Sequence, residues 1–212
     1  MPSFGNFIYA QFIAKYPVPT TSFASHTVIV TGGNGGLGKE TIKHIVRNGA
    51  SKVILTSRSR SRGEAAKAEI EDETKCSKSV IEVWELDLES AASIKGFVDK
   101  VNGLPRLDVM INNAGIQGVE FKIVHGTERI LGVNVIGTFL LAMQVVPKLK
   151  ETARRYGVTP RMTFVGSALY DAASYPNDPG DDIFEWFTDE SRVNKFAQYV
   201  NPCLFGCFPF SN

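Results

Sequence analysis

Glycines dominate the segment of this chain that is best suited to chemistry. The apolar residues 28–30 run into Thr31, Gly32, Gly36 and Gly38, which have the spacing TGxxxGxG, and an amphipathic helix follows. Backbone approaches a phosphate closely only where side chains are absent, and the N–H groups and positive dipole end of the helix point at that phosphate. The spacing predicts a dinucleotide site, with a plain strand–helix connection as the alternative.

A second phosphate-binding motif overlaps the first and has to be excluded. Gly33 to Lys39 spells GxxxxGK, which begins the phosphate loop of nucleoside triphosphatases. That loop needs a Ser or Thr hydroxyl on the magnesium ion at the next position, where this chain has Glu40. A carboxylate there would repel the phosphates, so the sequence disfavours a triphosphatase.

Arg58 stands where dinucleotide folds recognise the adenosine ribose. It lies twenty residues after Gly38 and directly follows an apolar strand at Lys52–Ser57. An acid at this place binds the 2′-hydroxyl of NAD, whereas an arginine accommodates the 2′-phosphate of NADP. Since no acid occurs between Ser57 and Glu64, Arg58 predicts a preference for NADP(H); a solvated basic loop is the alternative.

Two further segments follow apolar strands and predict cofactor contacts. Asp87 comes after residues 80–86, where its carboxylate could accept from the adenine amino group or stabilise a helix N-terminus. Asn112-Asn113-Ala114-Gly115 ends the strand at 107–112, at the carboxyl edge where ligands bind in open α/β sheets. The predicted contacts at this edge are Asp87, Leu88, Asn113, Ala114 and Gly115.

These residues need a framework in which strands and helices alternate. The strands are predicted at 27–31, 52–57, 80–86, 107–112 and 161–165. The helices are predicted at 37–48, 62–73, from a Ser90 cap to 101, and at 126–155, where Pro147 predicts a kink or break. Strands joined by such helices form a parallel sheet with right-handed crossovers. The expected fold class is therefore α/β, a Rossmann-type doubly wound parallel sheet in three layers.

The length of 212 residues is typical of one domain with a sizeable core. We expect an N-terminal arm at 1–25, a dinucleotide-binding domain at 26–199 and an irregular tail at 200–212. Residues 171–182 are polar and predict a loop. The aromatic segment 183–189 is interpreted as a lid.

Composition excludes several other classes of protein. Lys and Arg number 23 against 22 Asp and Glu, so no net field favours nucleic acid. The three cysteines, Cys76, Cys203 and Cys207, are too few for a disulfide framework, and they lack the second ligand pair of a zinc site, so no metal is expected. We expect no membrane span, because no stretch of ~20 apolar residues is apparent. The cytoplasm is the expected compartment.

In the order and spacing of its motifs, the chain resembles the short-chain dehydrogenase/reductase family from about Ser22 to Tyr199. The motifs are residues 31–38, Asp87-Leu88, residues 112–115, and Gly166-Ser167 after the fifth strand. The amino-acid sequence is similar to that of a fungal, retinol-dehydrogenase-like branch in segments 17–23, 84–87, 133–141 and 184–187. The resemblance implies NAD(P)(H), hydride transfer between a carbonyl and an alcohol, and a small-molecule substrate. A homo-oligomer is also expected. It also permits a place in secondary metabolism.

The resemblance assigns three catalytic residues. Asn134 matches the asparagine that holds a water in a proton relay, and Ser167 matches the serine that hydrogen-bonds the substrate oxygen. Tyr199 is the match for the general acid/base. Leu37 belongs to the implied cofactor site. The alternatives are packing or capping for Asn134 and Ser167, and a surface position for Tyr199.

The sequence departs from the family at the YxxxK motif. The lysine lowers the tyrosine pKa through its charge, but the fourth residue after Tyr199 is Cys203, and Pro202 would disrupt the helix. Frames that start at Tyr170 or Tyr175 do not supply the lysine either. We therefore expect very low turnover, with an inactive nucleotide-binding or partner-binding remnant as the alternative. The change in composition after Tyr199 is interpreted as truncation, and an unpaired strand edge at 161–165 predicts association.

Overall fold

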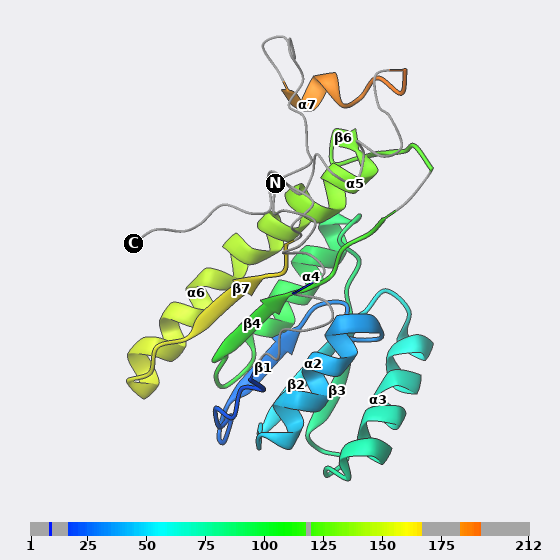
Figure 1. The fold of residues 1–212 in the computed structure, drawn as a ribbon. Helices are drawn as coiled ribbons and strands as arrows, with labels where there is room; N and C mark the ends of the chain where they lie inside the picture. The colour runs from blue at the N-terminus through cyan, green and yellow to red at the C-terminus, as the bar shows by residue number, and fades with distance from the viewer. Residues whose placement is uncertain (1–8, 10–16, 118–119, 167–182, 192–212) are drawn as a thin grey trace.

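Five parallel strands form the central sheet of the computed structural model, which describes residues 9, 17–117, 120–166 and 183–191. The strands lie in the order β3-β2-β1-β4-β7 (Figure 1). Their bounds are β1 Thr27–Val30, β2 Lys52–Ser57, β3 Ile81–Glu85, β4 Val109–Asn112 and β7 Arg161–Phe164. The order reverses between β1 and β4, which is the switch point of a doubly wound sheet and confirms the predicted fold class.

Helices cover both faces of this sheet, and the pleat of the strands explains how each face gets its own core. Val28 and Val30 of β1 pack with α2 (Gly36–Arg47) and α3 (Arg60–Thr74), whereas Ile29 between them packs with α4 (Ala91–Asn102) and α6 (Thr138–Tyr156). Successive strand side chains point to opposite faces, so a run of apolar residues feeds two cores.

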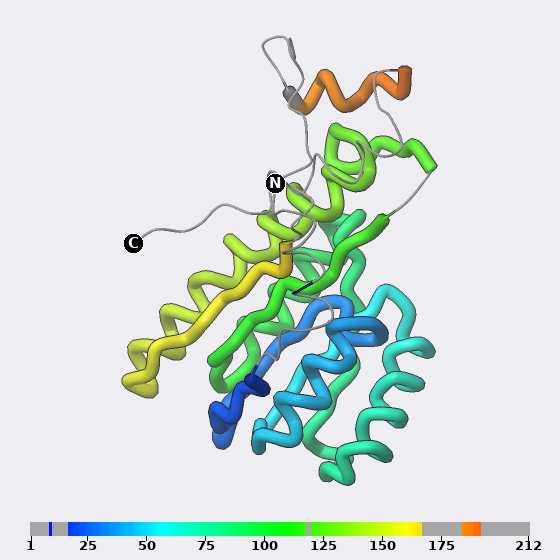
Figure 2. The backbone as a smooth tube through the Cα atoms, viewed as in Figure 1, coloured from blue at the N-terminus to red at the C-terminus, as the bar shows by residue number. Residues whose placement is uncertain are grey.

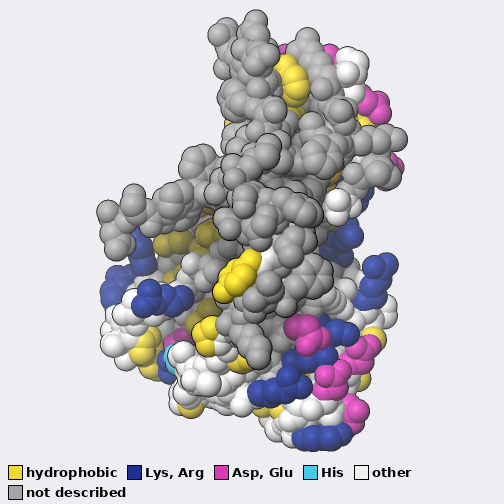
Figure 3. All heavy atoms as spheres, viewed as in Figure 1, with side chains coloured by type: hydrophobic (Ala, Val, Ile, Leu, Met, Phe, Trp, Pro, Cys, Tyr) yellow, Lys and Arg dark blue, Asp and Glu magenta, His cyan; other side chains and the backbone are white. Residues whose placement is uncertain are grey.

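Ion pairs tie the two helices of the first face together. Lys39 contacts Glu69 at 2.6 Å, and the buried Lys43 contacts Glu73 at 2.7 Å, so each pair joins α2 to α3. Figure 3 shows Lys and Arg side chains beside Asp and Glu side chains on this part of the surface, at the lower right. The mixture of signs agrees with the balanced composition.

Serine caps begin two helices. The Ser90 hydroxyl accepts from the Ser93 N–H at 3.2 Å at the start of α4, as the sequence predicted. The Ser59 hydroxyl accepts from the Arg62 N–H at 3.4 Å, so α3 begins at Arg60, two residues earlier than predicted. Each cap satisfies an N–H that has no partner within the helix.

The segment predicted as one helix over 126–155 is instead several elements. Strands β5 (Ile123–Val124) and β6 (Thr127–Glu128) form a hairpin, and α5 (Arg129–Leu131), the π-helix η1 (Gly132–Gly137) and α6 follow. The hairpin turn has φ values of 53° at His125 and 80° at Gly126. The segment 126–155 is mostly apolar, and this composition alone does not reveal the hairpin or the change of helical pitch.

Of the kink or break predicted at Pro147, the break is wrong, because α6 continues through that residue to Tyr156. The kink stays a prediction. A proline leaves the carbonyl four residues earlier without its helical donor. That carbonyl belongs to Met143, and both Met143 and Pro147 are exposed, so water can replace the missing N–H.

The helical stretch Arg129–Tyr156 is, by length and composition, long and apolar enough to cross a membrane, contrary to the expectation above. Its side chains Leu141, Val145 and Leu149 are buried in the core against α4, and just over half of its most apolar window is buried. Its apolar composition is therefore accounted for by core packing in this fold.

Two flanking segments are partly described. Phe23 packs beneath α2 and β2, and its N–H donates to the Asn48 carbonyl at 2.8 Å. Within the predicted lid, α7 (Ile183–Trp186) lies beyond the carboxyl ends of the strands (Figure 2), and the buried Phe187 packs on Leu131 and Val135. The predicted loop at 171–182 and tail at 200–212 lie outside the described residues.

Candidate functional site

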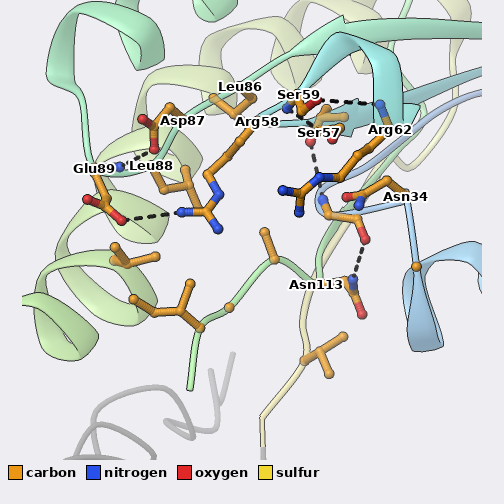
Figure 4. Close-up of a pocket in the computed structure, with 18 of the residues that line it drawn as sticks. Asn34, Ser57, Arg58, Ser59, Arg62, Leu86, Asp87, Leu88, Glu89 and Asn113 are labelled. Carbon is orange, nitrogen blue, oxygen red and sulfur yellow. Dashed lines mark hydrogen bonds and ion pairs between the residues drawn. The ribbon is translucent and has the colours of Figure 1, made fainter. Parts of the chain in front are cut away.

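A pocket of about 670 Å³ opens at the carboxyl ends of the first four strands (Figure 4). This volume lies within the usual range of about 300–1,000 Å³ for small-molecule sites. Several predicted cofactor residues line it, namely Gly32, Leu37, Arg58, Asp87, Leu88, Asn113, Ala114 and Gly115. The remaining predicted ones, Thr31, Gly36 and Gly38, lie in the same turn but do not line the pocket.

Thr31 joins the glycine turn to the segment after β4. Its buried hydroxyl accepts from the N–H groups of Asn113 and Ala114, each at 2.9 Å. The Asn113 side chain in turn donates to the Thr31 carbonyl at 2.9 Å. These hydrogen bonds join two segments more than eighty positions apart, and together the two segments form one wall of the pocket.

Gly38 allows the N-terminus of α2 to sit against this wall. A Cβ at Gly38 would lie 2.5 Å from the Gly32 carbonyl oxygen and 2.5 Å from Asn113 Nδ2. Gly32 and Gly36 have φ values of 65° and 51°, in the left-handed region that favours glycine. The turn therefore needs glycine at these positions for two different reasons.

The start of α2 fits a phosphate group. Beyond the turn and the helix themselves, a Cβ at Gly35 or Gly36 would meet no atom of the described residues within 4 Å, so these residues leave space above the turn. No side chain caps the helix and its first turn has no acidic residue, so its N–H groups and dipole are left for an anion. This geometry fits the pyrophosphate of a dinucleotide.

Two arginines occupy the end of the pocket beside β2. In Figure 4 Arg58 extends toward Glu89, while Arg62 extends into the pocket beside Asn34. Arg58 Nη1 lies 3.4 Å from Glu89 Oε1, and no carboxylate in the described part of the chain lies within ion-pair distance of Arg62. As far as the described residues go, the pocket thus presents one unpaired and one weakly paired guanidinium to a ligand.

Sequence reasoning missed Asn34, Ser57, Arg62 and Glu89 as lining residues. Arg62 was visible only as part of a run of alternating Ser and Arg. The Ser59 cap indicates where α3 begins, and this places Arg62 in its first turn, facing the pocket. Glu89 directly follows Asp87-Leu88, and no sequence feature of its own identified it as a pocket residue.

Asp87 shapes its own loop as well as lining the pocket. Its Oδ1 accepts from the Glu89 N–H at 3.0 Å, and its N–H donates to the Ser93 hydroxyl at 3.0 Å. Ser90 caps α4, three residues after Asp87. Stabilisation of the Asp87 carboxylate by the dipole of this helix N-terminus stays a prediction.

Asn134 lies in η1, close to the pocket. Its Oδ1 accepts from the Ile116 N–H at 2.8 Å and its Nδ2 donates to the Ile116 carbonyl at 3.0 Å. Both ends of the side-chain amide therefore hold the pocket-lining residue Ile116, which makes Asn134 a positioning residue. Its part in a proton relay stays a prediction.

Ser167 and Tyr199 lie outside the described residues, so their catalytic roles also stay predictions. The strand that precedes Ser167 ends at the pocket, because Val165 lines it and the Val165 N–H donates to the Asn112 carbonyl at 2.9 Å. Among the residues that the structure describes, no group of three or more His, Cys, Asp or Glu side chains could hold a metal ion.

Comparison with known proteins identifies the family of this pocket and fold. A family model described as short chain dehydrogenase matches residues 26–159. The chain therefore belongs to the short-chain dehydrogenase/reductase family, a class of oxidoreductases that bind nicotinamide dinucleotides.

The similar proteins include two fungal relatives. The chain is 42% identical over 199 residues to short chain dehydrogenase/reductase dmxR8 of Cryptosporiopsis sp. (strain 8999), covering 92% of this chain and 61% of that protein. It is 36% identical over 208 residues to short chain dehydrogenase FGM9 of Gibberella zeae, covering 98% and 61%. The chain thus spans about three-fifths of the length of these relatives.

A solved structure is similar in fold. The short-chain dehydrogenase from Sphingobium yanoikuyae in complex with NADPH superimposes with a TM-score of 0.62 at 22% identity, covering 85% of this chain and 61% of that one.

Proposed function

We propose that this chain is an NADP(H)-preferring oxidoreductase for the interconversion of a small carbonyl compound and its alcohol. The observation that carries the proposal is the pocket at the strand ends with Arg58 and Arg62 at its ribose side. A guanidinium matches the geometry and charge of a phosphate, whereas the ribose hydroxyl of NAD(H) offers it no such partner.

The chain's own residues have separate tasks in this proposal. The glycine turn and the first N–H groups of α2 bind the pyrophosphate, and Asp87 and Leu88 contact the adenine. Asn113, Ala114 and Gly115 form the floor toward the nicotinamide end, where Asn134 keeps Ile116 in place. When bound, the nicotinamide ring supplies or accepts the hydride.

Titration of both cofactors, followed by nucleotide fluorescence, tests this preference. We expect NADPH to bind more tightly than NADH, and Arg58→Ala to weaken NADPH by about 10- to 100-fold, as for loss of a charged hydrogen bond. Arg60→Ala is the matched control, because Arg60 is exposed, pairs with Glu64 and does not line the pocket. Tighter binding of NADH, or an unchanged NADPH affinity in Arg58→Ala, would contradict the proposal.

A second candidate function is cofactor binding with little or no turnover. Cys203 stands where the family has lysine. The positive charge that would lower the pKa of Tyr199 from a tyrosine's ordinary value of about 10 is therefore missing. Loss of general acid–base catalysis costs about 10²- to 10⁴-fold in rate.

Consumption of NADPH with a panel of aldehydes, ketones and quinones separates the two candidates. Negligible turnover with intact cofactor binding supports the second. A robust rate that disappears in Tyr199→Phe supports the first.

We also propose a compartment, an assembly state and a biological role for the protein. We propose the cytoplasm as its compartment and a homo-oligomer as its assembly state, and we propose a role in secondary metabolism on the strength of its resemblance to the fungal branch of the family. Microscopy of a fluorescent fusion, light scattering and metabolite profiling of a deletion strain test these three points separately.

A further inference from the structure

Glu89 is an acid inside a pocket proposed to bind a polyanion, and its surroundings explain how it is tolerated there. Its side chain is 13% exposed. Arg129 donates to Oε1 from Nε at 2.8 Å and from Nη2 at 2.6 Å, and Lys122 contacts Oε2 at 3.1 Å. Both cations flank the β5–β6 hairpin, since Lys122 directly precedes β5 and Arg129 directly follows β6. Figure 4 shows Arg58 extending toward Glu89.

Arg58 is the third and weakest partner of Glu89. Its single contact with Oε1 is 3.4 Å long, and its side chain is 54% exposed. Burial would raise the pKa of Glu89, but the hydrogen bonds from Arg129 and Lys122 outweigh burial and hold the pKa below its usual range. Glu89 is therefore ionised at neutral pH and remains well paired when Arg58 leaves it.

We propose that Glu89 is a positioning residue that competes with the 2′-phosphate for Arg58 and thereby limits the preference for NADP(H), an inference that rests on the function proposed above. In the free protein Glu89 keeps the Arg58 guanidinium on the β3 side of the pocket. Binding of NADPH requires Arg58 to exchange a carboxylate for a phosphate. Binding of NADH requires no such exchange, so the Arg58–Glu89 contact reduces only the affinity for NADPH.

The size of the effect follows from the exposure of the pair. An ion pair with a long contact and a half-exposed arginine stabilises weakly, and its loss corresponds to about a two- to fivefold change in an equilibrium constant. Because Arg129 and Lys122 remain on Glu89, no buried charge is left alone when Arg58 turns away.

Cofactor dissociation constants of the wild type, Glu89→Gln, Arg58→Ala and the double variant test the inference. We expect Glu89→Gln to tighten NADPH by about two- to fivefold and to leave NADH unchanged. The gain should vanish in the Arg58→Ala background, since the carboxylate acts through that arginine. Glu120→Gln is the matched control, because Glu120 also contacts Arg129, at 3.7 Å, but does not line the pocket.

Three results would overturn the inference. An equal gain in the Arg58→Ala background would mean that Glu89 only repels the phosphate. A loss of NADPH affinity would mean that Glu89 prepares Arg58 for binding. Equal weakening of both cofactors with a lower melting temperature would mean that Glu89 is merely structural.

Two further measurements keep the test independent of folding and of the proposed function. Glu89→Asp retains a charge for Arg129 and shortens the reach toward Arg58, so it should shift NADPH in the same direction if Glu89→Gln does not fold. A wild type that prefers NADH but shows the expected pattern in the variants would refute the proposed cofactor preference and support the role of Glu89. A wild type that binds neither dinucleotide would refute both.

Discussion

At the scale of single residues, the charged groups of the pocket show that side chains far apart in the sequence can be in direct contact. Arg58 and Glu89 follow neighbouring strands, and their side chains meet at 3.4 Å although they are 31 positions apart. Arg58 was predicted from its place after β2, whereas Glu89 follows from the parallel pairing of β2 with β3. Of this pair, to which we assign a part in cofactor recognition, only Arg58 was predictable.

Glu128 provides a prediction at the same scale. Its side chain is 1% exposed, and Oε2 accepts from the N–H groups of Ile130 and Leu131, whereas Oε1 has no hydrogen-bond partner in the described part of the structure. Burial raises the pKa of Glu128, and the backbone hydrogen bonds offset this only in part. The folded state therefore binds a proton more tightly than the unfolded state at this residue.

The sign of the pH dependence follows. Between the unfolded and folded pKa of Glu128, the folded state holds more protons, so the contribution of Glu128 to stability falls as pH rises through its folded pKa. We expect Glu128→Gln to lose less stability than the wild type as pH rises from about 4.5 to about 7.5. Urea denaturation at several pH values measures this difference, with Glu120→Gln at an exposed acid as control. Parallel curves for wild type and Glu128→Gln would contradict the pKa shift.

At the scale of elements, the site depends on how closely α2 approaches the segment after β4. Thr31, Asn113 and Gly38 form this contact, and it holds the turn in the shape that opens toward the pocket. On the other side, η1 brings Asn134 to Ile116. A π-helical segment is uncommon and often occurs at functional sites. The elements thus place two separate loops around one pocket.

Gly38→Ala tests the first of these contacts. The added Cβ would lie 2.5 Å from a backbone oxygen and from Asn113 Nδ2, so we expect a loss of about 1–3 kcal/mol in the free energy of unfolding, together with weaker cofactor binding. Gly96→Ala is the matched control, because Gly96 is exposed within α4 and its Cβ would meet nothing within 4 Å. That variant should gain about 0.5–1 kcal/mol from helix propensity. Urea denaturation measures the free energy of unfolding of both variants. A shift of the two variants in the same direction would contradict the prediction.

At the scale of the whole molecule, the pocket draws its walls from most of the sheet. Its residues follow β1, β2, β3 and β4, and Val165 follows β7, so a ligand there contacts segments from across the described fold. Such a ligand binds the folded state only, and its binding free energy adds to the stability of the fold.

Thermal denaturation with cofactor tests this coupling. At a free NADPH concentration of about 100 times its dissociation constant, the folded state gains about 2.7 kcal/mol. For a chain of this size we expect the melting temperature to rise by roughly 5–10 °C, with a smaller rise for NADH at the same concentration. Arg58→Ala should reduce the NADPH shift and leave the NADH shift in place. Equal shifts for both cofactors would contradict the proposed preference.

The sequence by itself determined the local features of this protein. The strand Lys52–Ser57 was predicted with the observed bounds, the other sheet strands to within two residues, and the Ser90 cap as observed, because β-branched runs and capping residues act over a few positions. The glycine turn was likewise predictable, since its backbone conformation requires glycine wherever the turn occurs.

Only the tertiary structure decided the features that depend on distant neighbours. The β5–β6 hairpin and η1 occur where the mostly apolar sequence predicted one helix. Gly132 and Gly137 let this segment pack closely against the Val124 and Leu88 carbonyl groups. The helix continues through Pro147 at a position where both Met143 and Pro147 are exposed, so water can replace the missing N–H donor. Arg62 and Glu89 join the pocket because parallel pairing brings the strand ends together. In each case the deciding contact joins atoms that are close in space but separated along the chain, and a local pattern carries no record of such a contact.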